Sequence, residues 1–292
     1  MTEIINIETK NNKAQVCSGE LVGFEQGGIQ YIHGGGKPSD LKQTEDYSGW
    51  QKSEIIMFPI VGAVVGYKVR LEDRFVNHDI HGISNAIEFV TESQESNSVQ
   101  LVQRYDGKAP IKNPNYKPRS ACPEYLEWPF KYELRKSIEL TETGIKIGIS
   151  LTNKSSIDMP YMLGFHPAFR TLGKVHPAVF VELSGESYTL EEVIKESIEG
   201  NGALFLKGVE RLSYENTGTK KGFEFISGNF NNIMMWSPGK DSGMFCIEPI
   251  TNLPEESPAA RKYFVNKTQH KIIKPEETKD YWVEIKPKLL SK

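Results

Sequence analysis

The feature that most constrains the fold of this chain is a series of short segments in which apolar and polar residues alternate. Between Ile145 and Thr152, isoleucine or leucine occupies every second position, with Lys, Gly, Ser and Thr between them. A two-residue period places the apolar side chains on one face of a β-strand and is typical of a half-buried strand. The same interpretation applies to segments 179–183, 223–226, 232–236 and 281–285.

Turn-forming residues separate these segments along the whole chain. Its 25 glycines and 16 prolines are spread throughout the 292 residues, so no shift of composition divides it. The clearest helical window is 189–199, which predicts one short helix. We therefore expect an all-β protein, a large antiparallel β-sandwich forming a single domain over residues 1–292.

Charge and composition exclude several classes of partner. The chain has 35 basic and 38 acidic residues and a net charge of −3, which argues against a nucleic-acid-binding protein. The longest nearly apolar stretch, 55–65, is far shorter than the roughly 20 residues that span a bilayer. The three cysteines, Cys17, Cys122 and Cys246, are too few and too scattered for a disulfide framework. Because no signal peptide is visible, we expect a cytoplasmic protein with no membrane partner.

Some motifs lack the context that would give them a function. The sequence His33-Gly-Gly-Gly36 resembles an oxyanion loop, but no G-x-S-x-G nucleophile motif accompanies it, so it is interpreted as a turn. The pair His78 and His81 has a spacing that some zinc sites use, yet no third ligand is evident. Nucleotide-binding glycine motifs are absent from the sequence. The sequence therefore predicts neither a metal site nor a cofactor.

Two residues stand where acid–base chemistry is plausible. His166 lies among apolar and aromatic neighbours, and Pro167 favours an extended backbone before it, so His166 is expected at a strand end or in a loop. Glu248 follows four apolar residues and precedes Pro249, which predicts a carboxylate at the end of a buried strand. Burial there would raise its pKa and make it a stronger base. The alternatives are a core histidine and an ordinary strand-end glutamate.

A resemblance adds to this interpretation. The chain resembles the aldose 1-epimerase (mutarotase) family, in particular its branch of LacX and hexose-6-phosphate epimerases. The motifs that carry the resemblance occur in the family's order over most of the chain. They are Phe58-Pro-Ile-Val-Gly62, His81-Gly82, Trp128-Pro-Phe130, Leu151-Thr-Asn153, Met159-Pro-Tyr161, Gly164-Phe-His-Pro-Ala-Phe169, Trp236 and Cys246-Ile-Glu-Pro-Ile-Thr251.

The resemblance implies a β-supersandwich that interconverts the α and β anomers of a free sugar without a cofactor. It implies that Glu248 is the general base, that His166 is the general acid, and that His81 assists near the ring oxygen. Trp50, Tyr161 and Trp236 are candidates for stacking on the sugar, although most aromatic residues of a β protein belong to its core. The expected partner is a small sugar, bound by a monomer or a homodimer.

Two departures from the family pattern bear on specificity. Ala63 and Asn85 stand where related sequences often have arginine, which argues against a hexose 6-phosphate held in the usual way. Lys68, Arg70 or Arg74 are possible substitutes. A non-catalytic sugar-binding or regulatory protein on the same scaffold is the main alternative function. A glycoside hydrolase or lyase is a weaker one, because hydrolysis usually needs two carboxylates.

Overall fold

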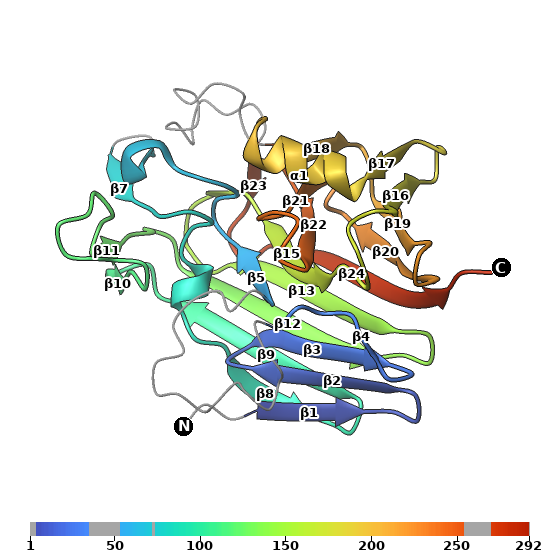
Figure 1. The fold of residues 1–292 in the computed structure, drawn as a ribbon. Helices are drawn as coiled ribbons and strands as arrows, with labels where there is room; N and C mark the ends of the chain where they lie inside the picture. The colour runs from blue at the N-terminus through green and yellow to red at the C-terminus, as the bar shows by residue number, and fades with distance from the viewer. Residues whose placement is uncertain (1–3, 35–52, 72–73, 254–269, 292) are drawn as a thin grey trace.

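The computed structural model describes residues 4–34, 53–71, 74–253 and 270–291, and in this part of the chain antiparallel strands dominate (Figure 1). The largest sheet has nine strands, which join the middle of the chain to its C-terminal strand. In sheet order they are β17 (Ser187–Thr189), β16 (Ala178–Glu182), β19 (Arg211–Asn216), β20 (Lys221–Gly228), β24 (Thr278–Leu289), β13 (Ile145–Asn153), β12 (Tyr132–Leu140), β9 (Ser98–Tyr105) and β8 (Val90–Gln94).

Two further sheets lie against the large one. The five-stranded sheet consists of β18 (Leu204–Lys207), β21 (Asn232–Trp236), β22 (Met244–Ile250), β15 (Gly164–Arg170) and β5 (Glu54–Met57), in that order. The four-stranded sheet is a meander of β1 (Ile4–Glu8), β2 (Asn12–Cys17), β3 (Glu20–Gln26) and β4 (Ile29–Gln30).

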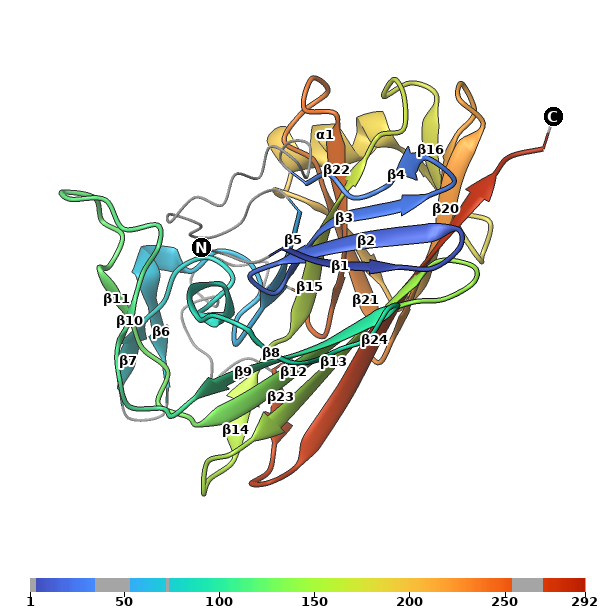
Figure 2. The same ribbon diagram turned by 90° about the horizontal axis from the view of Figure 1, so that it is seen from below.

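Smaller elements complete the described fold. The two-stranded pairs β6–β7 and β10–β11 lie on the side of the molecule away from the C-terminus (Figure 2). The strands of these two pairs are β6 (Lys68–Arg70), β7 (Phe75–Asn77), β10 (Ile111–Lys112) and β11 (Tyr125–Leu126). A third pair joins β14 (Met159–Tyr161) to β23 (Lys271–Ile273), and two 3-10 turns are η2 (Val65–Tyr67) and η3 (Ser84–Ala86).

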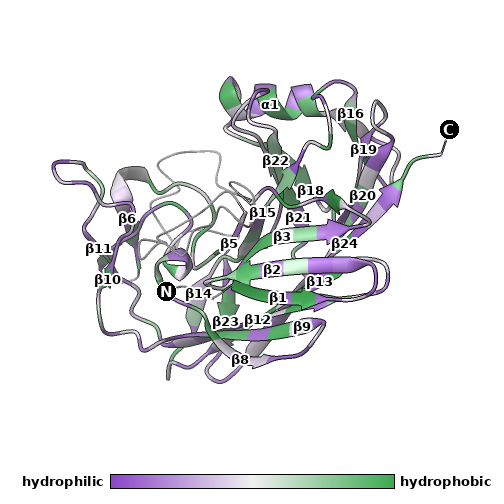
Figure 3. Ribbon diagram, turned by 60° about the horizontal axis from the view of Figure 1, so that its bottom comes forward, coloured by the Kyte–Doolittle hydropathy of each residue, from purple (hydrophilic) through white to green (hydrophobic). Residues whose placement is uncertain are grey.

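The predicted short helix is confirmed as α1 (Leu190–Ile198). Thr189 is its N-cap: the Thr189 hydroxyl accepts a hydrogen bond from the Glu192 backbone N–H, while the Glu192 carboxylate accepts one from the Thr189 N–H. This capping box satisfies two of the free donors of the first turn. The helix carries both apolar and polar residues (Figure 3), and it buries Leu190 and Val193. Among the described residues, none of the helices reaches the length and apolar character that a bilayer crossing requires.

The three sheets share one hydrophobic core, which explains the alternation in the sequence. In β13, Ile145, Ile147 and Ile149 are at most 1% exposed, as expected for the inward face of a strand. Aromatic rings join the sheets: the ring of Phe169 in β15 stacks on that of Phe223 in β20 with centroids 4.6 Å apart. The expected all-β antiparallel sandwich is therefore confirmed.

Candidate active site

His166 and Glu248 lie side by side on two adjacent inner strands of the five-stranded sheet. The pairs Gly164–Ile250 and Ala168–Cys246 fix the antiparallel register of β15 and β22, and this register places His166 opposite Glu248. Both residues are therefore in the interior of a strand. The sequence predicted a strand end or loop for His166 and a strand end for Glu248; the structure corrects both, because each strand continues past the proline that follows.

The prolines nevertheless have a local effect on this sheet. Pro167 and Pro249 have no backbone N–H and cannot donate to a β ladder. Between the pairs Gly164–Ile250 and Ala168–Cys246, where all the residues are described, no backbone pairing joins β15 and β22. The ladder is thus interrupted at the position where the imidazole and the carboxylate meet.

The two side chains are close and almost completely enclosed. Nε2 of His166 lies 3.5 Å from Oε1 of Glu248, and the residues are 6% and 0% exposed. Among the described residues, neither carboxylate oxygen of Glu248 has a hydrogen-bond partner. Buried polar atoms in native proteins are almost always hydrogen-bonded, and the exceptions often mark a catalytic or ligand-binding role.

His81 approaches this pair from a loop that follows β7. Its ring is perpendicular to that of His166, with centroids 5.2 Å apart. The backbone N–H of Gly62 donates to Nδ1 of His81 at 3.2 Å, so the neutral imidazole carries its proton on Nε2. His81 has a φ of 64° and Gly82 a φ of 81°, and the tight turn is held because Phe58 N–H donates to the His81 carbonyl.

Burial decides the protonation of the three side chains. It raises the pKa of Glu248 well above its ordinary value, because the carboxylate loses its hydration. Burial, with a further contribution from His81, holds the pKa of His166 well below its ordinary value. The pKa of His81 is lowered to about 4, again mainly by burial. These shifts leave both imidazoles uncharged at neutral pH and favour the protonated carboxyl group of Glu248 over the carboxylate.

The three aromatic candidates have different environments. Trp236 is half-buried in β21 next to the site, and its ring centroid is 6.2 Å from that of His166. Tyr161 lies in the core: it is 1% exposed, and its hydroxyl is hydrogen-bonded to that of Tyr281 at 2.6 Å. This packing gives no support for sugar stacking on Tyr161. Trp50 lies outside the described residues.

The histidine pair of the sequence does not come together as a metal site. His78 is fully buried, and its ring packs edge-on against Trp128, 5.6 Å between centroids, whereas His81 faces His166. Among the described residues, the structure brings together one other group of potential metal ligands. That group consists of His166, Cys246 and Glu248, with one ligand atom of each within 4.8 Å of the others.

Cys246 is the site residue that sequence reasoning missed. It lies two positions before Glu248 in β22, so both side chains point to the same face, while Phe245 and Ile247 point into the main core. Cys246 forms a small separate cluster with Ala168 and Met244, against which Trp236 packs. The two-residue spacing of Cys and Glu in a buried strand was the available signal.

Each of the positions that bear on specificity is at least partly exposed. Ala63 is exposed, and Asn85 is partly buried in η3. Lys68, Arg70 and Arg74 are exposed on or beside the β6–β7 hairpin.

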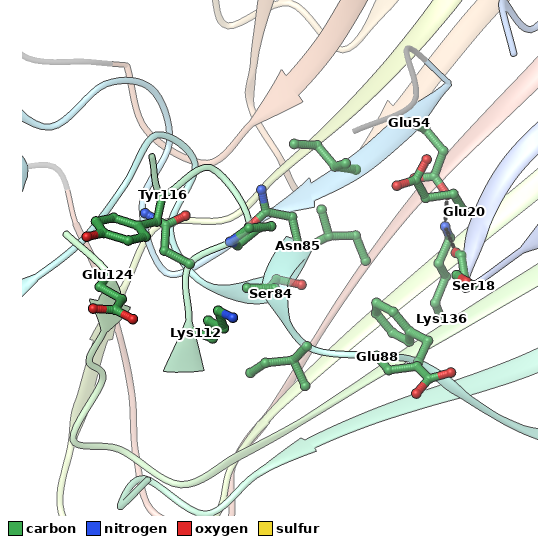
Figure 4. A pocket seen from close by; sticks show the side chains of 18 of the residues that line it. Ser18, Glu20, Glu54, Ser84, Asn85, Glu88, Lys112, Tyr116, Glu124 and Lys136 are labelled. Atoms are coloured by element: carbon green, nitrogen blue, oxygen red, sulfur yellow. Dashed lines mark hydrogen bonds and ion pairs between the residues drawn. The ribbon is translucent and has the colours of Figure 1, made fainter. Parts of the chain in front are cut away.

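A cavity of about 740 Å³ extends beyond β5, the edge strand of the five-stranded sheet (Figure 4). Asn85 and Ile55 line it, but His81, His166 and Glu248 do not. On one side lie Lys136, Glu20 and Glu54, and on the other lie Tyr116, Glu124 and Lys112. The acid–base group and this cavity are therefore separate features.

The side of this cavity near β5 is held by an ion pair that the sequence did not reveal. Lys136 Nζ donates to Glu54 and, at 2.7 Å, to the carbonyl of Gly19, and Lys136 and Glu54 are at most 1% exposed. The Leu21 N–H donates to the same Glu54 oxygen at 2.7 Å. Lys136 is the one charged residue at an inward position of β12, and that break in the alternation was its signal.

Solved structures share the fold of this chain. A galactose mutarotase-like protein from Lactobacillus casei ATCC 334 has a TM-score of 0.76 and 18% identity, covering 98% of this chain and 100% of that one. A galactose mutarotase related enzyme from Lactobacillus acidophilus also has a TM-score of 0.76, with 16% identity over 99% of this chain and 98% of that one. The chain has the galactose mutarotase-like fold.

More distant structures share this galactose mutarotase-like fold. An aldose epimerase homologue from C. elegans has a TM-score of 0.66 and 10% identity, covering the whole of both chains. No family model and no curated protein matches the sequence. The fold is therefore shared with mutarotase-like proteins although little of the sequence is.

Proposed function

We propose that this protein is an aldose 1-epimerase (mutarotase) that interconverts the α and β anomers of an uncharged hexose or a related sugar. One observation carries the proposal: His166 Nε2 lies 3.5 Å from Glu248 Oε1 in an enclosed site where the carboxylate has no hydrogen-bond partner among the described residues. The sequence motifs around both residues and the mutarotase-like fold support it.

The chemistry needs one base at the O1 hydroxyl and one acid at the ring oxygen, two atoms that are both bonded to the anomeric carbon. Glu248 removes the proton from the O1 hydroxyl, and the O1 electrons form the carbonyl while the bond from C1 to the ring oxygen breaks. His166 delivers its proton to the ring oxygen. The open aldehyde rotates about the bond from C1 to C2, and the reverse proton transfers close the ring as the other anomer.

Burial opposes the protonation states that the first step needs. The step requires Glu248 as a carboxylate and His166 as an imidazolium, whereas burial raises the pKa of Glu248 and lowers that of His166. Sugar hydroxyls entering the site supply hydrogen bonds that stabilise this ion pair in place of water. His81, with its proton on Nε2, is placed to donate to the ring oxygen or a neighbouring hydroxyl.

The neutral side chains at Ala63 and Asn85 support a sugar without phosphate, since related sequences often have arginine at both positions. Trp236 supplies a half-buried ring beside His166 on which a sugar face can stack. We further propose that residues 1–292 form one domain, active in the cytoplasm as a monomer or homodimer.

Anomer exchange measured by NMR tests the proposal. Purified protein is added to α-glucose, α-galactose and glucose 6-phosphate, and the rate above spontaneous mutarotation is compared between variants. Glu248→Gln and His166→Gln are each expected to lower the catalysed rate by about 10²–10⁴-fold, the usual contribution of a general acid or base. Glu142→Gln, at an exposed turn position, is the matched control.

Two results would overturn this assignment. Exchange as fast in Glu248→Gln and His166→Gln as in the wild type would remove both residues from the mechanism. Saturable sugar binding with no acceleration of exchange would favour the alternative, a non-catalytic sugar-binding protein on this scaffold, which the missing arginines also support.

A further inference from the structure

The face of the five-stranded sheet that carries His166 and Glu248 holds a third chemically active group, the thiol of Cys246. One ligand atom from each of the three residues lies within 4.8 Å of the others, and all three side chains are buried. The three residues come from two adjacent strands, β15 and β22, so the sheet itself fixes their relative positions. We infer that this group is a binding site for a thiophilic divalent cation, with Zn²⁺ as the best fit.

The distances suit tetrahedral coordination. With Zn–N near 2.0 Å and Zn–O near 2.1 Å, two ligands at a tetrahedral angle lie roughly 3.4 Å apart, and a nitrogen and a sulfur lie roughly 3.5 Å apart. The separation of His166 Nε2 and Glu248 Oε1 is already 3.5 Å. The remaining pairs of ligand atoms lie within 4.8 Å of one another. Side-chain movements of about 1 Å would bring them to the separations of tetrahedral coordination.

The charges and the donor types also fit. On binding, the thiol and the carboxyl group release their protons to solvent, and lone pairs of sulfur, oxygen and the His166 nitrogen form the bonds to the metal. A thiolate and a carboxylate together neutralise the double charge of the cation, so no net charge is left buried. Imidazole, thiolate and carboxylate form a borderline-soft set that zinc accepts, whereas Mg²⁺ and Ca²⁺ require mainly oxygen ligands.

Glu248 provides independent support, because neither of its buried oxygens has a hydrogen-bond partner among the described residues. A bound cation would satisfy one of them. The three side chains leave the fourth position of a tetrahedral zinc for a water or a sugar oxygen.

The functional consequence rests on the proposed function: the metal occupies the lone pairs that Glu248 and His166 need for proton transfer, so it inhibits anomer exchange. Binding itself does not depend on that proposal. The cation is therefore an inhibitor of the site and not a cofactor of the reaction.

Co²⁺, which reports thiolate ligation through a charge-transfer absorption band, is the direct probe. Chelator-treated full-length protein is titrated with Co²⁺ by absorption and with Zn²⁺ by calorimetry. The expected result is one equivalent bound with a thiolate band. Cys246→Ser should abolish the band and weaken Zn²⁺ binding at least about tenfold, as should Cys246→Ala. Cys17 is a buried cysteine of β2 outside the group, so Cys17→Ser should keep the thiolate band and the Zn²⁺ affinity of the wild type.

Lack of a saturable thiolate band, or equal Zn²⁺ binding by the wild type and the folded Cys246 variants, would overturn the inference. The exchange assay separates it from the proposed function. Zn²⁺ should slow exchange in the wild type and Cys17→Ser but have a much smaller effect in each Cys246 variant, relative to the same variant without metal. If the wild type catalyses exchange but binds no metal, only the metal-site inference is refuted. If it binds the metal but does not accelerate exchange, only the proposed epimerase activity is refuted.

Discussion

His78 should make this fold sensitive to acid, and the size of the effect follows from its environment. Its side chain is 0% exposed and packs edge-on against Trp128, and neither ring nitrogen has a hydrogen-bond partner among the described residues. Burial lowers its pKa from 6.5 to about 3. The unfolded chain therefore binds a proton at a pH where the folded protein does not.

The sign and the magnitude can be worked out. A group whose pKa is depressed on folding contributes stability above the unfolded pKa of 6.5, and this stability is lost as the pH falls towards 3. At about 1.4 kcal/mol for each pKa unit, His78 alone should lower the free energy of unfolding by about 2 kcal/mol between pH 7 and pH 5. Below pH 3 the loss should reach about 5 kcal/mol.

Urea unfolding at pH 7 and pH 5 measures this difference. His78→Phe keeps an aromatic ring against Trp128 but cannot be protonated, so the fall in unfolding free energy between the two pH values should be about 2 kcal/mol smaller than in the wild type. His78→Leu serves as a second variant. His176→Phe is the control, because His176 has a side chain 79% exposed. An equal fall in the wild type and both His78 variants would refute the reasoning.

Two further substitutions test the packing around the site. Gly82→Ala should destabilise the fold by about 2–4 kcal/mol and slow anomer exchange. At φ +81° the added Cβ would lie 2.3 Å from the Phe58 carbonyl oxygen, in the turn that holds His81. Unchanged urea unfolding and exchange rates would contradict this. Lys136→Ala should lower the free energy of unfolding, measured in urea, by about 3–5 kcal/mol, because it leaves the Glu54 carboxylate buried without its cation. The double variant Lys136→Met with Glu54→Leu should recover most of that loss. Equal stability of the single and the double variant would show that the pair is not coupled.

The fold class could be predicted because its signal is local. Alternation in segment 145–152 requires one buried and one solvated face, and this segment lies in strand β13. Segment 232–236, also predicted as a strand, forms β21 with its three central residues buried. The helix at 190–198 could be predicted for the same reason, since a short local pattern suffices for it. Neither result needs knowledge of which strands are neighbours.

The candidate site depends on such knowledge. The motifs named His166 and Glu248, but their separation of 82 positions says nothing about distance, and only the register of β15 with β22 brings them to 3.5 Å. The prolines after both residues suggested strand ends, because a proline removes a ladder hydrogen bond. The structure keeps both strands intact and interrupts only the pairing between them.

The sequence by itself determined that the chain is built of half-buried strands, and it named the histidines and the glutamate around which chemistry can occur. Tertiary structure decided which groups meet: Cys246 with that pair, Lys136 with Glu54, and Tyr161 with Tyr281 in the core. The physical reason is that alternation fixes the face on which a side chain lies, whereas contacts across a sheet and between sheets depend on register and packing. Burial, and with it the opposed pKa shifts of Glu248 and His166, exists only once those sheets have come together.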